Sequence, residues 1–290
     1  MATLAYEIVD VFTDRPFTGN PLAVVFGAEH LAGAQLQSLA REFHLSETAF
    51  VLPPTVDQAT YRLRIFTPEA ELPFAGHPSV GAAVTQLRRG AIEAGPIVQE
   101  CGAGLLPLTV RDDGSATLTG GAPRVGLRVD PELLLKAVDL DVEDLVGADL
   151  HPARLAGCGL EFAYLPVRPE AVGRAVAPAA SPDLPMITVL AWDPGSATAH
   201  VRVFCPGAGV PEDPATGSAA LGLGVWLVVS GLLPPDGTAR YTVRQGSELH
   251  RPSTLDCTVD SVAGIVSSAT VTGHVVPIAS GAIVIPPFVG

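Results

Sequence analysis

Two stretches of the sequence decide the fold: RIFTPEAELPFAGHPSVGAA at residues 64–83, and RVFCP at 202–206 followed by PEDPATGSAALG at 211–222. Each reads as a strand, a proline turn, an acidic stretch, a glycine followed by a polar residue, and the start of a helix rich in small residues. The opening arginines are 138 residues apart and the helix-start glycines 141 apart, close to half of the 290 residues. The sequence therefore predicts a duplicated domain.

A fainter repeat supports the duplication. AFVLP at residues 49–53 is similar to FAYLP at 162–166, and the two pairs of similar segments occur in the same order. We expect two similar lobes with a boundary near the GGAP turn at 120–123.

The 30 glycines and 27 prolines are spread over the whole chain, and short β-branched runs recur between them. This pattern favours a strand-rich α+β protein. The expected strands are Tyr6–Val11, Leu22–Phe26, Tyr61–Phe66, Ala116–Leu118, Ile187–Ala191, His200–Phe204, Arg240–Val243, Thr254–Val259 and Ala282–Ile285. The expected helices are Leu31–Phe43, Val80–Arg89, Pro131–Val138 and Ala219–Leu233.

Composition argues against several classes of partner. The hydrophobic content of 48% is enough for a proper core, and the net charge of −13 disfavours binding to nucleic acid or to an anionic membrane. The N-terminal residues lack the pattern of a secretory signal, so we expect a cytoplasmic protein. The longest apolar run, Ala219–Leu233, is shorter than the roughly 20 residues of a bilayer span and is interpreted as a buried helix.

Metal and disulfide sites are not indicated. The four cysteines form no CxxC pair and the seven histidines form no HxxxH or HExxH arrangement. Fragments such as Gly157-Cys158-Gly159 lack the strand and helix context of a dinucleotide fingerprint.

The two predicted helix starts are candidate anion sites. The first begins with Gly76 and His77, the second with Thr216, Gly217 and Ser218. A helix start offers free backbone N–H groups and the positive end of the helix dipole, which together bind anions. Alternatively, Thr216 and Ser218 are ordinary capping residues and His77 is a surface side chain. The duplication favours the anion-site interpretation, because both helix starts would then bind one substrate carboxylate.

Glu47 is the candidate proton carrier. It follows an amphipathic helix and leads into an apolar strand, so partial burial would raise its pKa toward the range useful for acid and base catalysis. Its alternative is a solvent-exposed residue at a helix end. Asp213 and Glu212 precede the second helix start, where capping is a sufficient explanation, with proton donation as a further possibility. Asn20 in TGNP is either a turn residue or a substrate-binding residue.

Five motifs together resemble the PhzF, or phenazine-biosynthesis-like, family, and they span nearly the whole chain in order. They are DVFTDRPFTGNPLAVVF (10–26), SETAFV (46–51), RIFTPEAELPFAGHPSVGAA (64–83), EDPATGSAA (212–220) and QGSELHRPS (245–253). The resemblance implies the diaminopimelate-epimerase fold, with each lobe a curled, barrel-like β-sheet around a central helix and the active site between the lobes. The implied lobes are residues 1–122, completed by a C-terminal strand at about 279–290, and residues 123–278.

The resemblance also implies a homodimeric isomerase that acts on a small carboxylate-bearing substrate without metal or organic cofactor. In this family Glu47 would be the general acid/base, assisted by His77 and Asp213. Gly76, Gly217 and Ser218 would bind the substrate carboxylate.

The related epimerases and racemases carry a cysteine at each helix start, where this chain has Ala75 and Thr216. Racemisation by two thiols is therefore not available, and a shuttle with one base, as in a double-bond shift, fits better. Two alternatives stay open. The protein could be an epimerase or racemase with Asp213 as the second proton donor, or a protein that binds a carboxylate without turnover.

Overall fold

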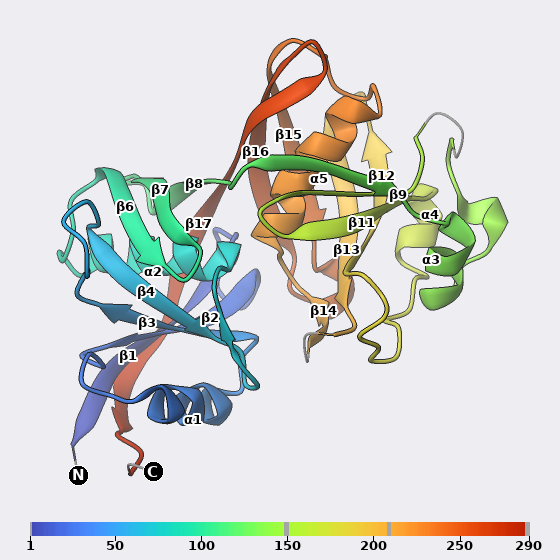
Figure 1. Ribbon diagram of the computed structural model, residues 1–290. Coiled ribbons are helices and arrows are strands. Elements are labelled where there is room, and N and C mark those ends of the chain that lie inside the picture. Colours follow the sequence, from blue (N-terminus) through green and yellow to red (C-terminus); the bar gives the residue numbers. More distant parts are fainter. Residues whose placement is uncertain (1, 148–150, 208–209, 288–290) are drawn as a thin grey trace. The chain divides into compact units, whose positions relative to one another are not determined.

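The chain forms two compact units that are described here one at a time. The computed structural model describes residues 2–147, 151–207 and 210–287 (Figure 1). Unit 1 comprises Met1–Leu118 and Thr272–Gly290, and unit 2 is the contiguous stretch Thr119–Val271. The C-terminal part of unit 1 begins at Thr272 rather than near residue 279, because the long strand β17 (Ile265–Val284) belongs to both units.

Unit 1 is a closed barrel of eight strands. Its strands pair in the cyclic order β1, β2, β3, β4, β6, β7, β8 and β17, and β17 returns to β1. The pairs β2–β3 and β4–β6 are parallel, and the others with a described register are antiparallel. The strands are β1 (Thr3–Val11), β2 (Asn20–Phe26), β3 (Glu47–Leu52), β4 (Tyr61–Phe66), the short β5 (Glu71–Leu72) beside β4, β6 (Gly95–Cys101), β7 (Gly104–Val110) and β8 (Ser115–Thr119).

Helix α2 (Gly76–Arg88) is enclosed by this barrel. Every residue from Gly76 to Gln86 is buried, and the helix contacts β1, β2, β3 and β7. Gly81 allows the close approach, since a Cβ there would lie 2.5 Å from a methyl group of Leu22. A second helix, α1 (Gly33–Phe43), buries only one face, which includes Leu36 and Leu39, against β3 and β4.

Unit 2 repeats the same plan with a second buried helix. The strand pairs β11–β12 and β13–β15 are parallel, as β2–β3 and β4–β6 are in unit 1. The pairs β10–β11, β12–β13 and β15–β16 are antiparallel. The strands are β9 (Pro123–Arg128), β10 (Arg154–Cys158), β11 (Glu161–Pro166), β12 (Ile187–Asp193), β13 (Thr198–Cys205), β14 (Val210–Asp213), β15 (Gly237–Gln245) and β16 (Ser253–Val262). Helix α5 (Gly217–Val229) is buried from Gly217 to Val228 and contacts β9, β10, β11 and β16.

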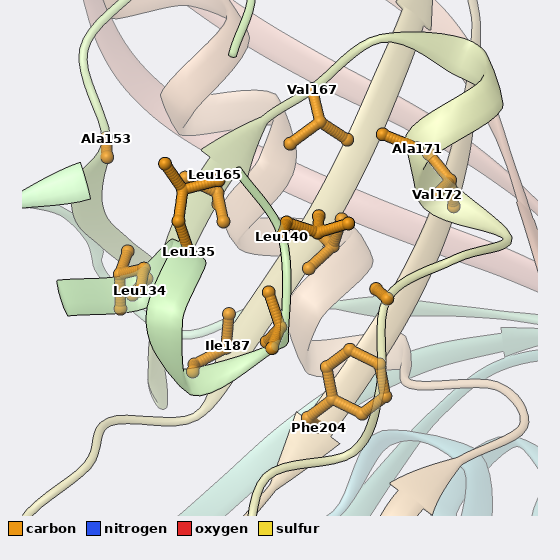
Figure 2. Packing of buried hydrophobic residues seen from close by; sticks show 14 of the residues in the cluster. Leu134, Leu135, Leu140, Ala153, Leu165, Val167, Ala171, Val172, Ile187 and Phe204 are labelled. Atoms are coloured by element: carbon orange, nitrogen blue, oxygen red, sulfur yellow. The ribbon is translucent and has the colours of Figure 1, made fainter. Parts of the chain in front are cut away.

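Two short helices cover the outer side of the second sheet. Helices α3 (Pro131–Ala137) and α4 (Pro169–Val172) contribute Leu134, Leu135 and Val172 to a cluster of buried apolar side chains. Figure 2 shows these side chains gathered with Leu165, Ile187 and Phe204 from the strands. The predicted helices at 131–138 and 219–233 are confirmed within a few residues at each end.

The duplication extends to individual side chains. In unit 1, Arg64 binds Glu71 through two hydrogen bonds of 2.7 Å and lies 5.1 Å from the centroid of Phe66. In unit 2, Arg202 binds Glu212 at 2.8 and 2.7 Å and lies 5.0 Å from the ring centroid of Phe204. Capping was therefore the wrong explanation for Glu212, which is the ion-pair partner of Arg202.

The fainter repeat is contradicted by the topology. Strand β3 forms an antiparallel pair with β4. In unit 2 the equivalent of β4 is β13, and the strand that forms an antiparallel pair with β13 is β12, not β11. The AFVLP and FAYLP segments therefore lie on non-equivalent strands. Their similarity follows from the apolar alternation that any buried strand requires.

Two glycines of α5 make room for buried tyrosines. A Cβ at Gly222 would lie 2.4 Å from the hydroxyl of Tyr164, and one at Gly224 would lie 2.5 Å from that of Tyr241. The two hydroxyls donate to the carbonyls of Ala219 and Ala220 at 2.7 and 2.8 Å, so each buried O–H is satisfied by the helix backbone.

We predict that Gly222→Ala lowers the free energy of unfolding by about 2 kcal/mol, although alanine is the better helix former. The added methyl group displaces the Tyr164 hydroxyl and leaves it buried without its acceptor. Urea unfolding measures the change. Gly173→Ala is the control, because Gly173 has an α-helical backbone and open space around it, and equal effects of the two substitutions would contradict the explanation.

Candidate active site

Glu47, His77 and Asn20 come together in unit 1. Glu47 is the first residue of β3, Asn20 the first of β2 and His77 the second of α2. The carboxylate Oε2 of Glu47 lies 3.6 Å from His77 Nε2, and Asn20 Nδ2 lies 3.2 Å from His77 Nδ1. The parallel pairing of β2 with β3 and the enclosed α2 thus bring three distant segments of the sequence into one cluster.

Glu47 is a buried carboxyl group. Its side chain is 15% exposed, and Oε2 accepts no hydrogen bond from any residue in the described ranges. Burial raises its pKa to about 7, because the ionised form loses its hydration, while the neighbouring Ser46 side chain acts in the opposite direction. The exposed helix-end interpretation of Glu47 is therefore wrong. Near neutral pH this carboxyl group can both accept and release a proton.

A turn that requires glycine places Asn20. Gly19 has a φ of +69°, and a Cβ there would lie 2.4 Å from the carbonyl oxygen of Val11. Asp10 accepts a hydrogen bond of 2.7 Å from the backbone N–H of Phe17, which ties the loop to β1. Asn20 itself is fully buried, so its amide must be satisfied by neighbouring groups.

Ser46 also belongs to this cluster, although no role was predicted for it from the sequence. Its hydroxyl donates to Asn20 Oδ1 at 3.2 Å, which connects the residue before Glu47 to the partner of His77. The SETAFV motif contains Ser46, but a hydrogen bond over 26 residues has no local signal in the sequence.

Asp213 forms a second cluster, in unit 2. Its Oδ2 accepts a hydrogen bond of 2.6 Å from the hydroxyl of Thr216. Gln245 is also buried here, and it accepts from the backbone N–H of Thr216 at 3.1 Å and donates to the carbonyl of Asp213 at 2.7 Å. Gln245 also donates to the Thr216 hydroxyl at 3.0 Å, which leaves the Thr216 proton directed at the Asp213 carboxylate.

The helix starts are equivalent in the two units. Ala75 and Thr216 are the N-cap residues of α2 and α5, and neither side chain caps its helix. The next two residues are Gly76 and His77 in α2, and Gly217 and Ser218 in α5, all of them buried. Thr216 is thus no ordinary capping residue, because its hydroxyl donates a hydrogen bond to Asp213. His77 is buried and is not a surface residue.

Of the equivalent strands β3 and β12, only β3 has a carboxyl group at its start. Thr48 of β3 is paired with Phe66, and the equivalent pair in unit 2 is Ile187 with Phe204. The residue before Thr48 is Glu47, and the residue before Ile187 is Met186. The proton carrier therefore has no counterpart at the equivalent position of unit 2.

Other kinds of site are not prominent in the described ranges. Among residues 2–147, 151–207 and 210–287, no three His, Cys, Asp or Glu side chains gather in a way that could hold a metal ion. Within the same residues, no helix combines the length and apolarity needed to cross a membrane.

Comparisons with known proteins give a single picture. A family model described as phenazine biosynthesis-like protein matches residues 9–281. An uncharacterized isomerase of Mesorhizobium japonicum is 35% identical, with 97% of this chain and 99% of that protein covered. The trans-2,3-dihydro-3-hydroxyanthranilate isomerase of Pseudomonas aeruginosa is 32% identical, with 95% and 98% covered.

Solved structures agree on the fold. A PhzF family protein of Bacillus anthracis has a TM-score of 0.85 at 26% identity, and 98% of this chain and 100% of that chain are covered. A hydroxyproline epimerase from Agrobacterium vitis has a TM-score of 0.66 at 16% identity, with 98% and 94% covered. The second likeness concerns the fold alone, and it confirms the expected diaminopimelate-epimerase type.

We predict that Glu47→Gln is more stable than the wild-type protein at pH 8 and about as stable at pH 5. A raised pKa means that Glu47 supports folding only while protonated, so its contribution is complete below its ordinary pKa of 4.5 and is lost as the pH rises through about 7. The margin should grow to about 3 kcal/mol over this range. Urea unfolding from pH 5 to 8 measures it.

The exposed Glu42 at the end of α1 provides the control for the Glu-to-Gln exchange itself. A stability difference between Glu47→Gln and the wild-type protein that does not vary with pH would contradict the buried, proton-binding carboxyl group.

Proposed function

Because this chain belongs to the phenazine biosynthesis-like family and is an isomerase of that family, we propose that it moves a proton on a small unsaturated or cyclic carboxylic acid, with Glu47 as the general acid/base. The observation that carries this proposal is the buried carboxyl group of Glu47, with a pKa of about 7, beside His77. A pKa near the working pH gives a base that removes a proton and an acid that returns it.

The proton shuttle uses one carboxyl group in this proposal. Glu47 as carboxylate takes a proton from one carbon of the substrate, and the resulting carboxylic acid delivers it to another position. The double bond shifts between the two carbons, so atoms and charge balance without a further reactant. The asymmetry between Glu47 and Met186 supports one base, and the absence of thiols at Ala75 and Thr216 argues against two.

The helix starts would hold the substrate carboxylate. Gly76, Gly217 and Ser218 lie in the first turns of α2 and α5, where backbone N–H groups and the helix dipole favour an anion. His77 would donate a hydrogen bond near the reacting atoms. Asp213, held by Thr216, would assist the proton transfer.

The epimerase and the non-catalytic binding protein are outcomes of the same experiment. An epimerase would invert a stereocentre and would use Asp213 as the second donor, whereas a binding protein would hold the ligand without exchanging its protons. The homodimer and the small carboxylate-bearing substrate belong to the same proposal, and analytical ultracentrifugation measures the oligomeric state.

We predict that the wild-type protein catalyses deuterium uptake from D₂O into its substrate and that Glu47→Gln reduces the rate at least about 1000-fold, because the amide cannot carry a proton. Mass spectrometry of small unsaturated amino and hydroxy acids, starting with trans-2,3-dihydro-3-hydroxyanthranilate, detects the exchange. Glu42→Gln is the matched control and should keep the wild-type rate. Full exchange by Glu47→Gln would refute the assignment of Glu47.

We predict that Ser218→Ala weakens binding of the substrate carboxylate about tenfold, the effect of one hydrogen bond to a charged group. Isothermal titration calorimetry with a substrate found by the exchange assay measures it. Ser267→Ala, on the exposed part of β17, should leave the affinity unchanged. An unchanged affinity for Ser218→Ala would argue against the anion site at α5.

A further inference from the structure

A chain of polar contacts leads from Ser46 through the buried side chains of Asn20 and His77 to the proposed proton carrier. The Ser46 hydroxyl donates to Asn20 Oδ1 at 3.2 Å, and Asn20 Nδ2 lies 3.2 Å from His77 Nδ1. On the other side of the imidazole, Nε2 lies 3.6 Å from Glu47 Oε2. Asn20 is fully buried and His77 is 3% exposed, so bulk water does not compete for these contacts.

The direction of each hydrogen bond follows from the chemistry of the groups. A primary amide accepts only at its oxygen and donates only at its nitrogen. Since Oδ1 of Asn20 receives the Ser46 proton, Nδ2 is the atom that faces His77. Nδ2 has no lone pair to offer, so Nδ1 of His77 must be the acceptor. A neutral imidazole with an unprotonated Nδ1 carries its proton on Nε2.

We infer that Asn20 is a positioning residue that holds His77 as the neutral tautomer with its proton on Nε2, so that His77 donates a hydrogen bond on the side of Glu47 and does not act as a second base. The tautomer is a property of the folded chain. Its importance for catalysis rests on the proposed function, in which Glu47 is the only proton carrier.

The reversed chain is disfavoured by Glu47. If the amide were rotated, Nδ2 would donate to Ser46, Oδ1 would accept from a protonated Nδ1, and the lone pair of Nε2 would face Glu47 Oε2 across 3.6 Å. An ionised carboxylate repels that lone pair, whereas an Nε2–H dipole attracts the carboxylate. The amide orientation and the ionised form of Glu47 therefore favour the same tautomer.

The test is nitrogen NMR of the full chain labelled with ¹⁵N-histidine. His77→Gln identifies the signals of His77 among the seven histidines. We expect an unprotonated Nδ1 and a protonated Nε2 in the wild-type protein at neutral pH. A protonated Nδ1 in the wild-type protein would overturn the inference.

Two variants test whether Asn20 is responsible. In Asn20→Asp both oxygens accept, so His77 should gain a proton on Nδ1. In Ser46→Ala the amide loses the donor that orients it, and both nitrogens should show averaged signals. Ser38→Ala removes a hydroxyl that donates to Ala34 within α1, and it should leave the His77 signals unchanged. The wild-type tautomer retained in both Asn20→Asp and Ser46→Ala would show that Asn20 does not set it.

Kinetic measurements distinguish this inference from the proposed function. With a substrate identified by exchange, Asn20→Asp should lower kcat by about tenfold or more and change KM little. The proton on Nδ1 alters the His77 imidazole beside Glu47 but leaves the proposed binding site of the substrate carboxylate unchanged. Exchange that fails for every substrate would refute the proposed function and leave the NMR result standing. An unchanged kcat with an altered tautomer would refute the catalytic part of the inference. Should Asn20→Asp not fold, Ser46→Ala and the wild-type spectrum still decide the tautomer.

Discussion

A helix enclosed by strands has no solvent-exposed face and needs small residues where the strands approach closely, and this steric constraint shapes both units. Helices α2 and α5 are buried over nearly their whole length, and small residues dominate their first turns. Such a helix cannot be stabilised by a polar outer face, so its stability depends on apolar packing against the strands. The barrel in turn needs the helix to fill its interior.

The same enclosure determines where polar chemistry can occur. A buried side chain near the start of an enclosed helix loses water but remains close to unpaired backbone N–H groups. Glu47 and His77 occupy this environment in unit 1, and Asp213 and Thr216 occupy it in unit 2. In each unit a buried amide, Asn20 or Gln245, controls the direction of the hydrogen bonds. The two amides lie on non-equivalent strands, β2 and β15, so this likeness between the clusters does not come from the duplication.

The fold could be predicted from the sequence because its signals are local and repeated. The strand and proline turn at 64–68 recur at 202–206, and the topology confirms that these segments are equivalent. Apolar periodicity alone predicted α2 only from Val80, whereas its start at Gly76 was correctly predicted from the repeated glycine-polar segment. Ser46 and Gln245 could not be assigned roles, because their partners lie far along the chain and side-chain hydrogen bonds leave no periodicity.

The long strand β17 has a consequence for synthesis on the ribosome. Residues 275–284 pair with β1, so the barrel receives its last strand only after these residues have been synthesised. Unit 2 is contiguous in sequence and its segments all emerge earlier. During that interval β1 has one unpaired edge, which is the kind of surface that recruits other strands. A nascent chain therefore carries an open sheet edge on β1 until residues 275–284 have left the ribosome.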